Sequence, residues 1–306
     1  MMFLRIGILI GFFASLVFSQ AARPSPSPTP FPEWKPPADR AKAKTPFAPK
    51  PTKGNNIFKD SAEAWLTDAI LKTEAKYIQP VNDADLNNYI TKLGSYLALY
   101  SAEPNRKYTF TIIDEPEENA FSIGDGRIYI NLGLLVSVES EDELAAVISH
   151  EIGHDAFKHG PKTVTRQFFW MTGVTKVNSA ADVEKDLSDL LAAYRKNTFA
   201  EVGEQMLGWS RNDELQADKT GFYTMYKAGY NPEAMKDVFR HFVAEEKKSS
   251  NYEAEYLLTL LFGSHPPSSQ RVTALKWESL WIKMPPKTDK VKSAAFDAAK
   301  ALAAKL

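Results

Sequence analysis

Three of the chain's five histidines lie in one short stretch, Glu143 to Gly160, which reads ELAAVISHEIGHDAFKHG. Its apolar spacing predicts a helix. Residues four apart lie on nearly the same face of a helix, so His150 and His154 can direct their ring nitrogens at one ion. Glu151 lies about 100° further round the axis, where a base acting on a metal-bound water belongs. This His-Glu-x-x-His spacing predicts metal-assisted hydrolysis.

A hydrolytic zinc site needs a third protein ligand and leaves one position to water. The segment NDELQAD supplies Glu214 and Asp218, again four residues apart on a predicted helix. We expect Glu214 to complete the ligand set of one zinc ion per chain. Asp218 would accept the free N–H of a ligating histidine. The alternative for His150 and His154 is a pair of buried histidines that bond to nearby carbonyl groups. The alternative for Glu214 and Asp218 is an ordinary acidic pair on a solvated helix face.

Three further histidines and an arginine remain to be assigned. His265 precedes two prolines in GSHPPSSQRV, so its loop should be stiff. We expect His265 to donate to an oxyanion or to fill the fourth zinc position at rest, with a loop histidine without a role as the alternative. Arg271 would pair with a carboxylate, either to position this loop or as a structural ion pair. His159 is expected near the C-terminus of its helix, where the dipole favours it. His241 is expected to be an ordinary surface or core histidine.

Composition narrows the chemistry. The 306 residues carry a net charge of −1 and no cysteine. Disulfides, thiolate nucleophiles and cysteine-ligated metals are therefore excluded, and any metal must be held by His, Asp or Glu. Because positive and negative charges nearly balance, the chain as a whole has no electrostatic attraction for nucleic acid.

The N-terminus predicts export. Arg5 precedes an uncharged apolar run over residues 6–19, and small residues surround Ala21. This pattern is typical of a signal peptide over residues 1–21, with an uncleaved N-terminal anchor as the alternative. Residues 24–52 hold 10 of the 19 prolines, so residues 22–56 predict an extended, disordered linker. The main domain is expected over residues 57–285, followed by an Ala/Lys-rich C-terminal helix over residues 286–306.

The main domain reads as α+β and mainly helical, with a small β-sheet beside the His-Glu-x-x-His helix. Helices are predicted over residues 60–78, 84–101, 181–196, 210–229 and 231–248. Strands are predicted over residues 107–114 and 119–135, the second region turning at Gly124-Asp125-Gly126. Ser140 and Glu143 form a capping box, and Gly160-Pro161 should stop the central helix. The segment over residues 161–209 is either a lid or a packed helical hairpin.

The ordered motifs resemble one family. His150-Glu-x-x-His154, Glu214-x-x-x-Asp218 and His265-Pro266 with Arg271 are similar to the HtpX and CAAX-prenyl-protease family of zinc metallopeptidases. The resemblance covers about residues 60–280 and implies a gluzincin-type fold, endopeptidase activity, ligation by the two motif histidines and Glu214, and catalysis by Glu151. The sequence shows no further apolar stretch long enough to span a membrane. It is therefore closer to the exported family members that act in the bacterial cell envelope.

The expected substrates are unfolded or misassembled proteins in the periplasm or cell envelope, with no nucleic acid and with peripheral membrane association open. The substrate backbone should pair with an edge strand at Asn119, Ala120 and Phe121, or at Arg127–Asn131. The first alternative is a non-catalytic holdase of peptidase-like fold. The second is hydrolysis of a lipid-derived amide.

Overall fold

The computed structural model describes residues 30–45, 47–51, 56–76, 78–195, 210–246, 269–286 and 291–306. The predicted signal peptide lies outside these residues. The described part from Phe31 onward forms one unit. Its elements, in chain order, are α1 (Asp60–Thr73), α2 (Ala84–Ala98), β1 (Thr109–Ile113), β2 (Ala120–Ser122), β3 (Arg127–Asn131), α3 (Leu132–Ser137), α4 (Glu141–Ala156), α5 (His159–Thr172), α6 (Ala180–Arg195), α7 (Arg211–Lys227), α8 (Ala234–Glu246), α9 (Ser269–Glu278), the short 3-10 helix η4 (Ser279–Trp281) and α10 (Ala294–Ala303).

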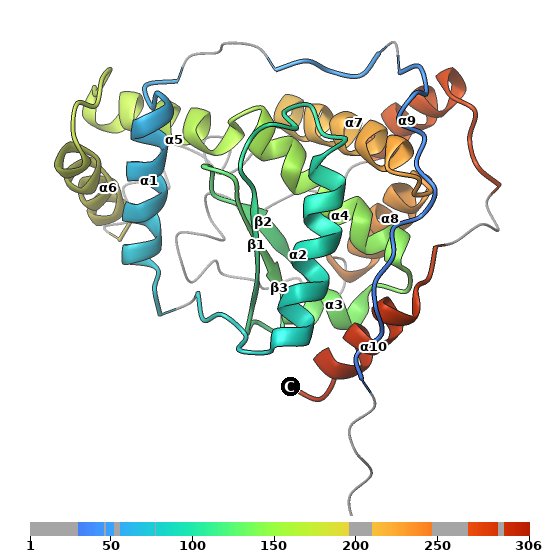
Figure 1. The fold of residues 1–306 in the computed structure, drawn as a ribbon. Coiled ribbons are helices and arrows are strands. Elements are labelled where there is room, and N and C mark those ends of the chain that lie inside the picture. The colour runs from blue at the N-terminus through green and yellow to red at the C-terminus, as the bar shows by residue number, and fades with distance from the viewer. Residues whose placement is uncertain are drawn as a thin grey trace, which may run out of the picture. The chain divides into compact units, whose positions relative to one another are not determined.

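The predicted fold class is confirmed: helices predominate around a three-stranded sheet of order β1-β3-β2 (Figure 1). β1 pairs with β3 in parallel, and β2 pairs with β3 in antiparallel fashion across the predicted glycine-rich turn. Successive strand side chains point to opposite faces. Ile112 and Ile130 therefore join one hydrophobic cluster, and Ile113 and Tyr129 join the other. The sheet thus separates two cores.

The smaller core is built on α1, α5 and α6. Leu66 and Ile70 of α1 pack with Phe168 of α5 and Leu187 of α6. Residues 161–209 were expected to form either a lid or a packed helical hairpin. In their described part, residues 161–195, the helices α5 and α6 pack against each other. Residues 196–209 lie outside the description.

The larger core surrounds α4, in which every residue is buried. A buried carboxylate needs hydrogen-bond partners, and those in the first turn of α4 find donors on other segments. Glu141 accepts from Trp34 Nε1 at 3.0 Å and from the Tyr230 hydroxyl at 2.8 Å. Asp142 accepts from the backbone N–H of Asn231 at 2.8 Å. These contacts fix the axis of the helix that carries the histidine pair.

Part of the predicted linker over residues 22–56 contacts the folded body. Phe31, Trp34 and Ala48 pack against the larger core. We call the described residues between 31 and 51 the N-terminal strap. The Arg40 guanidinium donates to the carbonyl oxygens of Tyr226 and Tyr230 at 3.2 Å each. Proline-rich backbone makes few hydrogen bonds of its own. Side chains of this segment, such as Trp34 and Arg40, therefore bind it to the folded body.

The described C-terminal residues include α10, which buries Ala295, Phe296 and Ala299 against the larger core. No helix in the described ranges is long and apolar enough to cross a membrane.

Candidate metal centre

The site lies where α4 and α7 approach closely. A Cβ atom at Gly153 would stand 3.0 Å from the carbonyl oxygen of Ala217. A Cβ atom at Gly221 would stand 3.0 Å from the backbone nitrogen of His150. Only glycine fits these contacts without displacement, so the two glycines let the helix backbones touch. Ser210 caps α7 in a capping box with Asp213 and sets where that helix begins.

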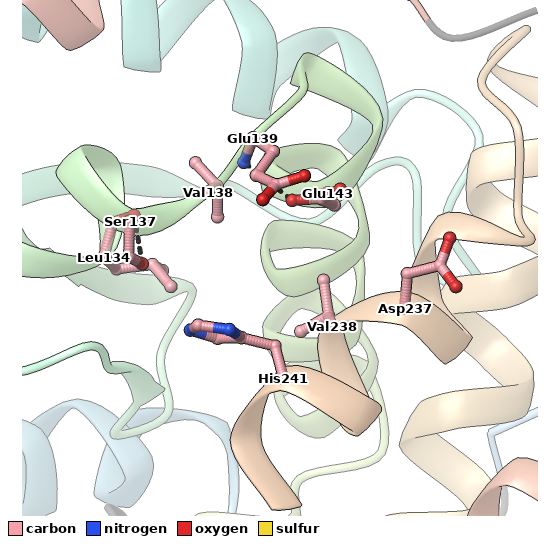
Figure 2. Close-up of a pocket in the computed structure, with 8 residues that line it drawn as sticks. All are labelled: Leu134, Ser137, Val138, Glu139, Glu143, Asp237, Val238 and His241. Carbon is pink, nitrogen blue, oxygen red and sulfur yellow. Dashed lines mark hydrogen bonds between the residues drawn. The ribbon is translucent and has the colours of Figure 1, made fainter. Parts of the chain in front are cut away.

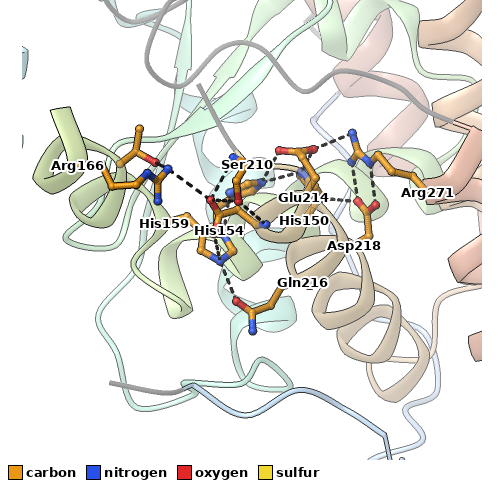
Figure 3. A network of polar contacts seen from close by, with 11 residues as sticks. His150, His154, His159, Arg166, Ser210, Glu214, Gln216, Asp218 and Arg271 are labelled. Carbon is orange, nitrogen blue, oxygen red and sulfur yellow. Dashed lines mark hydrogen bonds and ion pairs between the residues drawn. The ribbon is translucent and has the colours of Figure 1, made fainter. Parts of the chain in front are cut away.

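The close approach brings together the predicted ligand set of His150, His154 and Glu214 (Figure 3). The two histidine Nε2 atoms are 3.0 Å apart. Glu214 places Oε1 3.3 Å from Nε2 of His154 and Oε2 3.7 Å from Nε2 of His150. Three ligands of a tetrahedral zinc ion, each about 2.1 Å from it, lie about 3.4 Å apart. The donor set therefore fits one such ion, and all three residues are buried.

Asp218 lies behind the first of these histidines. Its Oδ1 is 2.9 Å from Nδ1 of His150, the ring nitrogen that points away from the ligand cluster. A carboxylate at this position holds the proton on Nδ1 and leaves the Nε2 lone pair for a metal. Burial raises the pKa of Asp218 to about 6, against the lowering effect of Arg271.

Arg271, on α9, links the two acidic residues. Its Nε and Nη2 bind the Asp218 carboxylate at 2.7 and 2.6 Å, and its Nη1 lies 2.7 Å from Glu214 Oε2. Its guanidinium also stacks over the ring of Phe239, 4.0 Å from the centroid. Arg271 was expected to pair with a carboxylate, either to position the His265 loop or as a structural ion pair. Its described partners are Glu214 and Asp218, the carboxylates of the site itself.

The position of His159 differs from the prediction. The central helix ends at Ala156, because Lys158 adopts a left-handed conformation with φ of 57°. Gly160 and Pro161 therefore lie in the first turn of α5 and do not end α4. His159 begins α5, and its Nδ1 lies 3.0 Å from Nδ1 of His154.

The buried histidines are in the protonation state that suits a metal. Burial lowers the pKa of His154 well below its ordinary value, although Glu214 acts in the opposite direction. Burial also lowers the pKa of His159. Both imidazoles are therefore neutral near pH 7, and a neutral imidazole is the form that ligates.

Glu151 follows the candidate ligand His150 on α4 and is buried. Burial lowers the pKa of Arg271, but the carboxylates of Asp218, Glu214 and Glu151 together raise it above its ordinary value, so Glu151 is close enough to act on Arg271. His265 lies outside the described residues, so its predicted role stays a prediction.

The sheet corrects one of the two predicted substrate strands. Arg127–Asn131 is β3, which pairs on both sides and has no free edge. β2 has one strand neighbour among the described strands and packs beside α4. Asn119 immediately precedes β2, and Ala120 and Phe121 are its first two residues. The side chains of Ala120 and Phe121 are buried in opposite cores.

A buried charge cluster fixes the β2–β3 turn to the end of α4. Asp155, directly after His154, accepts from the Ser122 hydroxyl at 3.1 Å and from the Gly126 N–H at 2.8 Å. Arg106 pairs with both Asp155 and Glu63. Sequence spacing gave no signal for this cluster, because its members come from four separate segments.

His241 lines a separate pocket of about 220 Å³ between the α3–α4 junction and α8 (Figure 2). Its Nε2 lies 2.6 Å from Glu118 Oε2, and the side chain is about half exposed. None of the three candidate metal ligands lines this pocket. His241 was expected to be an ordinary surface or core histidine, and its exposed side chain places it at the surface.

With fold and donor set defined, comparison with known proteins identifies the class. Residues 84–279 match the model of peptidase family M48, so the chain belongs to this family. The resemblance to the HtpX and prenyl-protease type of metallopeptidase is confirmed.

Three relatives show the range of the family. A Vibrio cholerae protein named as a beta-barrel assembly-enhancing protease is 30% identical over 205 residues, covering 64% of this chain and 40% of the relative. The mitochondrial metalloendopeptidase OMA1 of Schizosaccharomyces pombe is 26% identical over 189 residues, covering 61% and 51%. The metalloprotease LoiP of Escherichia coli K12 is 24% identical over 239 residues, covering 72% and 87%. The chain thus matches only about half or less of the length of the first two relatives.

Proposed function

We propose that this chain is a zinc-dependent endopeptidase that cleaves unfolded or misassembled proteins in the bacterial cell envelope. The observation that carries the proposal is the buried convergence of two histidines and a glutamate from α4 and α7. The family membership and the names of the relatives support hydrolysis of peptide bonds. The predicted signal peptide and the beta-barrel assembly-enhancing relatives support an exported, periplasmic location.

His150, His154 and Glu214 would hold the ion, one per chain. When bound, zinc polarises a substrate carbonyl and lowers the pKa of a water molecule. Glu151 accepts the proton of the attacking water and returns it to the leaving amine. His265 is assigned either to hydrogen-bond the carbonyl oxygen as charge develops there or to fill the fourth zinc position at rest.

The proposed substrate path follows the free edge of β2. An extended peptide would add alongside Asn119, Ala120 and Phe121 through those main-chain groups of β2 that point away from β3, because strand addition uses backbone hydrogen bonds. Such pairing does not need the buried side chains of Ala120 and Phe121. Backbone pairing recognises the main chain of the substrate more than its side chains, which suits unfolded proteins of varied sequence.

Glu151→Gln tests the proposal. The variant should keep one zinc ion per chain, because Glu151 is not a ligand. Its cleavage of a chemically unfolded protein should fall by about 10²–10⁴-fold, the usual contribution of a general base. Glu139→Gln is the matched control on an exposed carboxylate and should leave the rate unchanged.

Wild-type cleavage by Glu151→Gln would overturn the assigned base. A zinc-loaded wild-type chain that binds unfolded protein without cutting it would overturn the peptidase and favour the holdase.

A further inference from the structure

Four large apolar side chains gather at the far end of α9, away from the arginine that contacts the metal centre. Trp277, Leu280 and Trp281 are 62%, 69% and 56% exposed, and Phe47 is 45% exposed. They make up half of the large exposed hydrophobic residues in the described part of the chain. We call this set the aromatic patch.

The members of the aromatic patch come from two segments of the chain. Trp277, Leu280 and Trp281 follow one another across the junction of α9 and η4. The ring of Phe47, in the N-terminal strap, meets the ring of Trp281 with centroids 4.9 Å apart. Large apolar side chains exposed this close together indicate an interaction site.

The charges around the aromatic patch are basic. Lys276 and Lys283 flank it and are exposed. The nearest acidic residue, Glu278, faces inward, where it binds Lys219 at 2.9 Å and accepts from the Tyr223 hydroxyl at 2.6 Å. Its charge is thereby compensated within the fold, and the patch presents lysine and tryptophan to the outside.

Exposed tryptophan beside lysine helps to distinguish two kinds of partner, another protein and a lipid bilayer. Protein–protein interfaces are depleted in lysine. Tryptophan rings instead favour the boundary between lipid headgroups and acyl chains, and flanking lysines extend their ammonium groups to the phosphates. We propose that the aromatic patch docks this protein on the surface of an anionic lipid bilayer. Docking through α9 would hold the metal centre beside the membrane, because Arg271 of the same helix binds Glu214 and Asp218.

The test uses the chain from Ala22 onward, which omits the apolar leader and keeps every described residue. Binding is measured by co-sedimentation with vesicles of phosphatidylcholine, with and without phosphatidylglycerol. The wild type should bind the phosphatidylglycerol vesicles. Trp277→Ser with Trp281→Ser should weaken binding about tenfold or more, through lost apolar burial. Lys276→Gln with Lys283→Gln should weaken it about fivefold per lysine at low salt, and salt should remove the difference.

Leu99→Ser is the matched control, because Leu99 is 64% exposed but lies outside the patch, at the end of α2. It should bind like the wild type, and circular dichroism should show the same melting temperature for all variants. No wild-type binding, or equal binding by the tryptophan variant, overturns the proposal. Self-association that the tryptophan variant abolishes, without vesicle binding, assigns the patch to a second copy and also overturns it. None of these outcomes depends on peptidase activity.

Discussion

His159 Nδ1 lies 3.0 Å from His154 Nδ1, while its Nε2 lies 2.9 Å from Gln216 Oε1. An amide oxygen only accepts, so Nε2 of the neutral His159 carries the proton and its Nδ1 lone pair can accept a hydrogen bond. Nδ1 of His154 must then be the donor to His159. This leaves the Nε2 lone pair of His154 directed at the ligand cluster, as Asp218 does for His150.

Removing the acceptor at His159 should weaken metal binding. His159→Leu is expected to lower zinc affinity by about 10–100-fold, the usual cost of losing the partner of a ligating histidine. His159→Asn can place an amide oxygen near the former Nδ1 and should recover part of the affinity. Competition with a chromogenic chelator measures both. Equal affinity in wild type and His159→Leu would contradict the assignment.

The two acidic residues of α7 should separate in their effects on metal content. Glu214→Ala removes a proposed ligand, and purified protein should hold less than one zinc ion per chain. Asp218→Asn retains the ligands, so it should load fully at excess zinc but with lower affinity. Metal analysis after dialysis against graded zinc concentrations tells the two apart. Full retention of zinc by Glu214→Ala would refute its role as a ligand.

Arg271 should be a large stabilising element of the metal-free protein. Arg271→Met leaves Glu214 and Asp218 as buried carboxylates without their cation, and breaking such a buried group costs about 3–5 kcal/mol. Urea unfolding in the presence of a chelator measures the change. Arg240→Met is the control, since Arg240 and Asp237 form an exposed pair and its loss should change stability little. Equal effects of the two substitutions would show that the buried pairing contributes nothing.

Gly221 should matter for both stability and metal affinity. A Cβ atom there would meet the flexible Met235 Cε at 2.9 Å, but also the backbone of Ser149 and His150 at 3.0 Å. The methionine can move, and the backbone can yield only by separating α7 from α4. Gly221→Ala should therefore cost about 1–3 kcal/mol, typical of overpacking, and lower zinc affinity as well. Unchanged melting temperature and affinity would show that the helices have slack at this contact.

The core of the site could be predicted because it rests on local periodicity. The four-residue spacings of His150–His154 and Glu214–Asp218 place each pair on one helix face before any tertiary contact is known. Chemistry then requires the two faces to meet, since zinc needs a third ligand. The strands and their turn followed equally from alternation and from Gly124-Asp125-Gly126.

The parts that could not be predicted depend on single backbone angles or on long-range packing. The left-handed conformation of Lys158 moves His159 from the end of one helix to the start of the next, and no sequence rule marks a lysine for this conformation. The contacts of the N-terminal strap could not be predicted, because proline content excludes regular structure but says nothing about docking, which here involves Trp34 and Arg40. The central position of β3 depends on β1 pairing with it in parallel, a long-range choice.

The proposed chemistry depends on one zinc ion held between α4 and α7. Anomalous diffraction at the zinc absorption edge, from crystals grown with zinc, would locate this ion. We expect one strong peak within bonding distance of Nε2 of His150, Nε2 of His154 and the Glu214 carboxylate. No peak between these three side chains, or a peak bound only by other residues, would show that the ion is not held there.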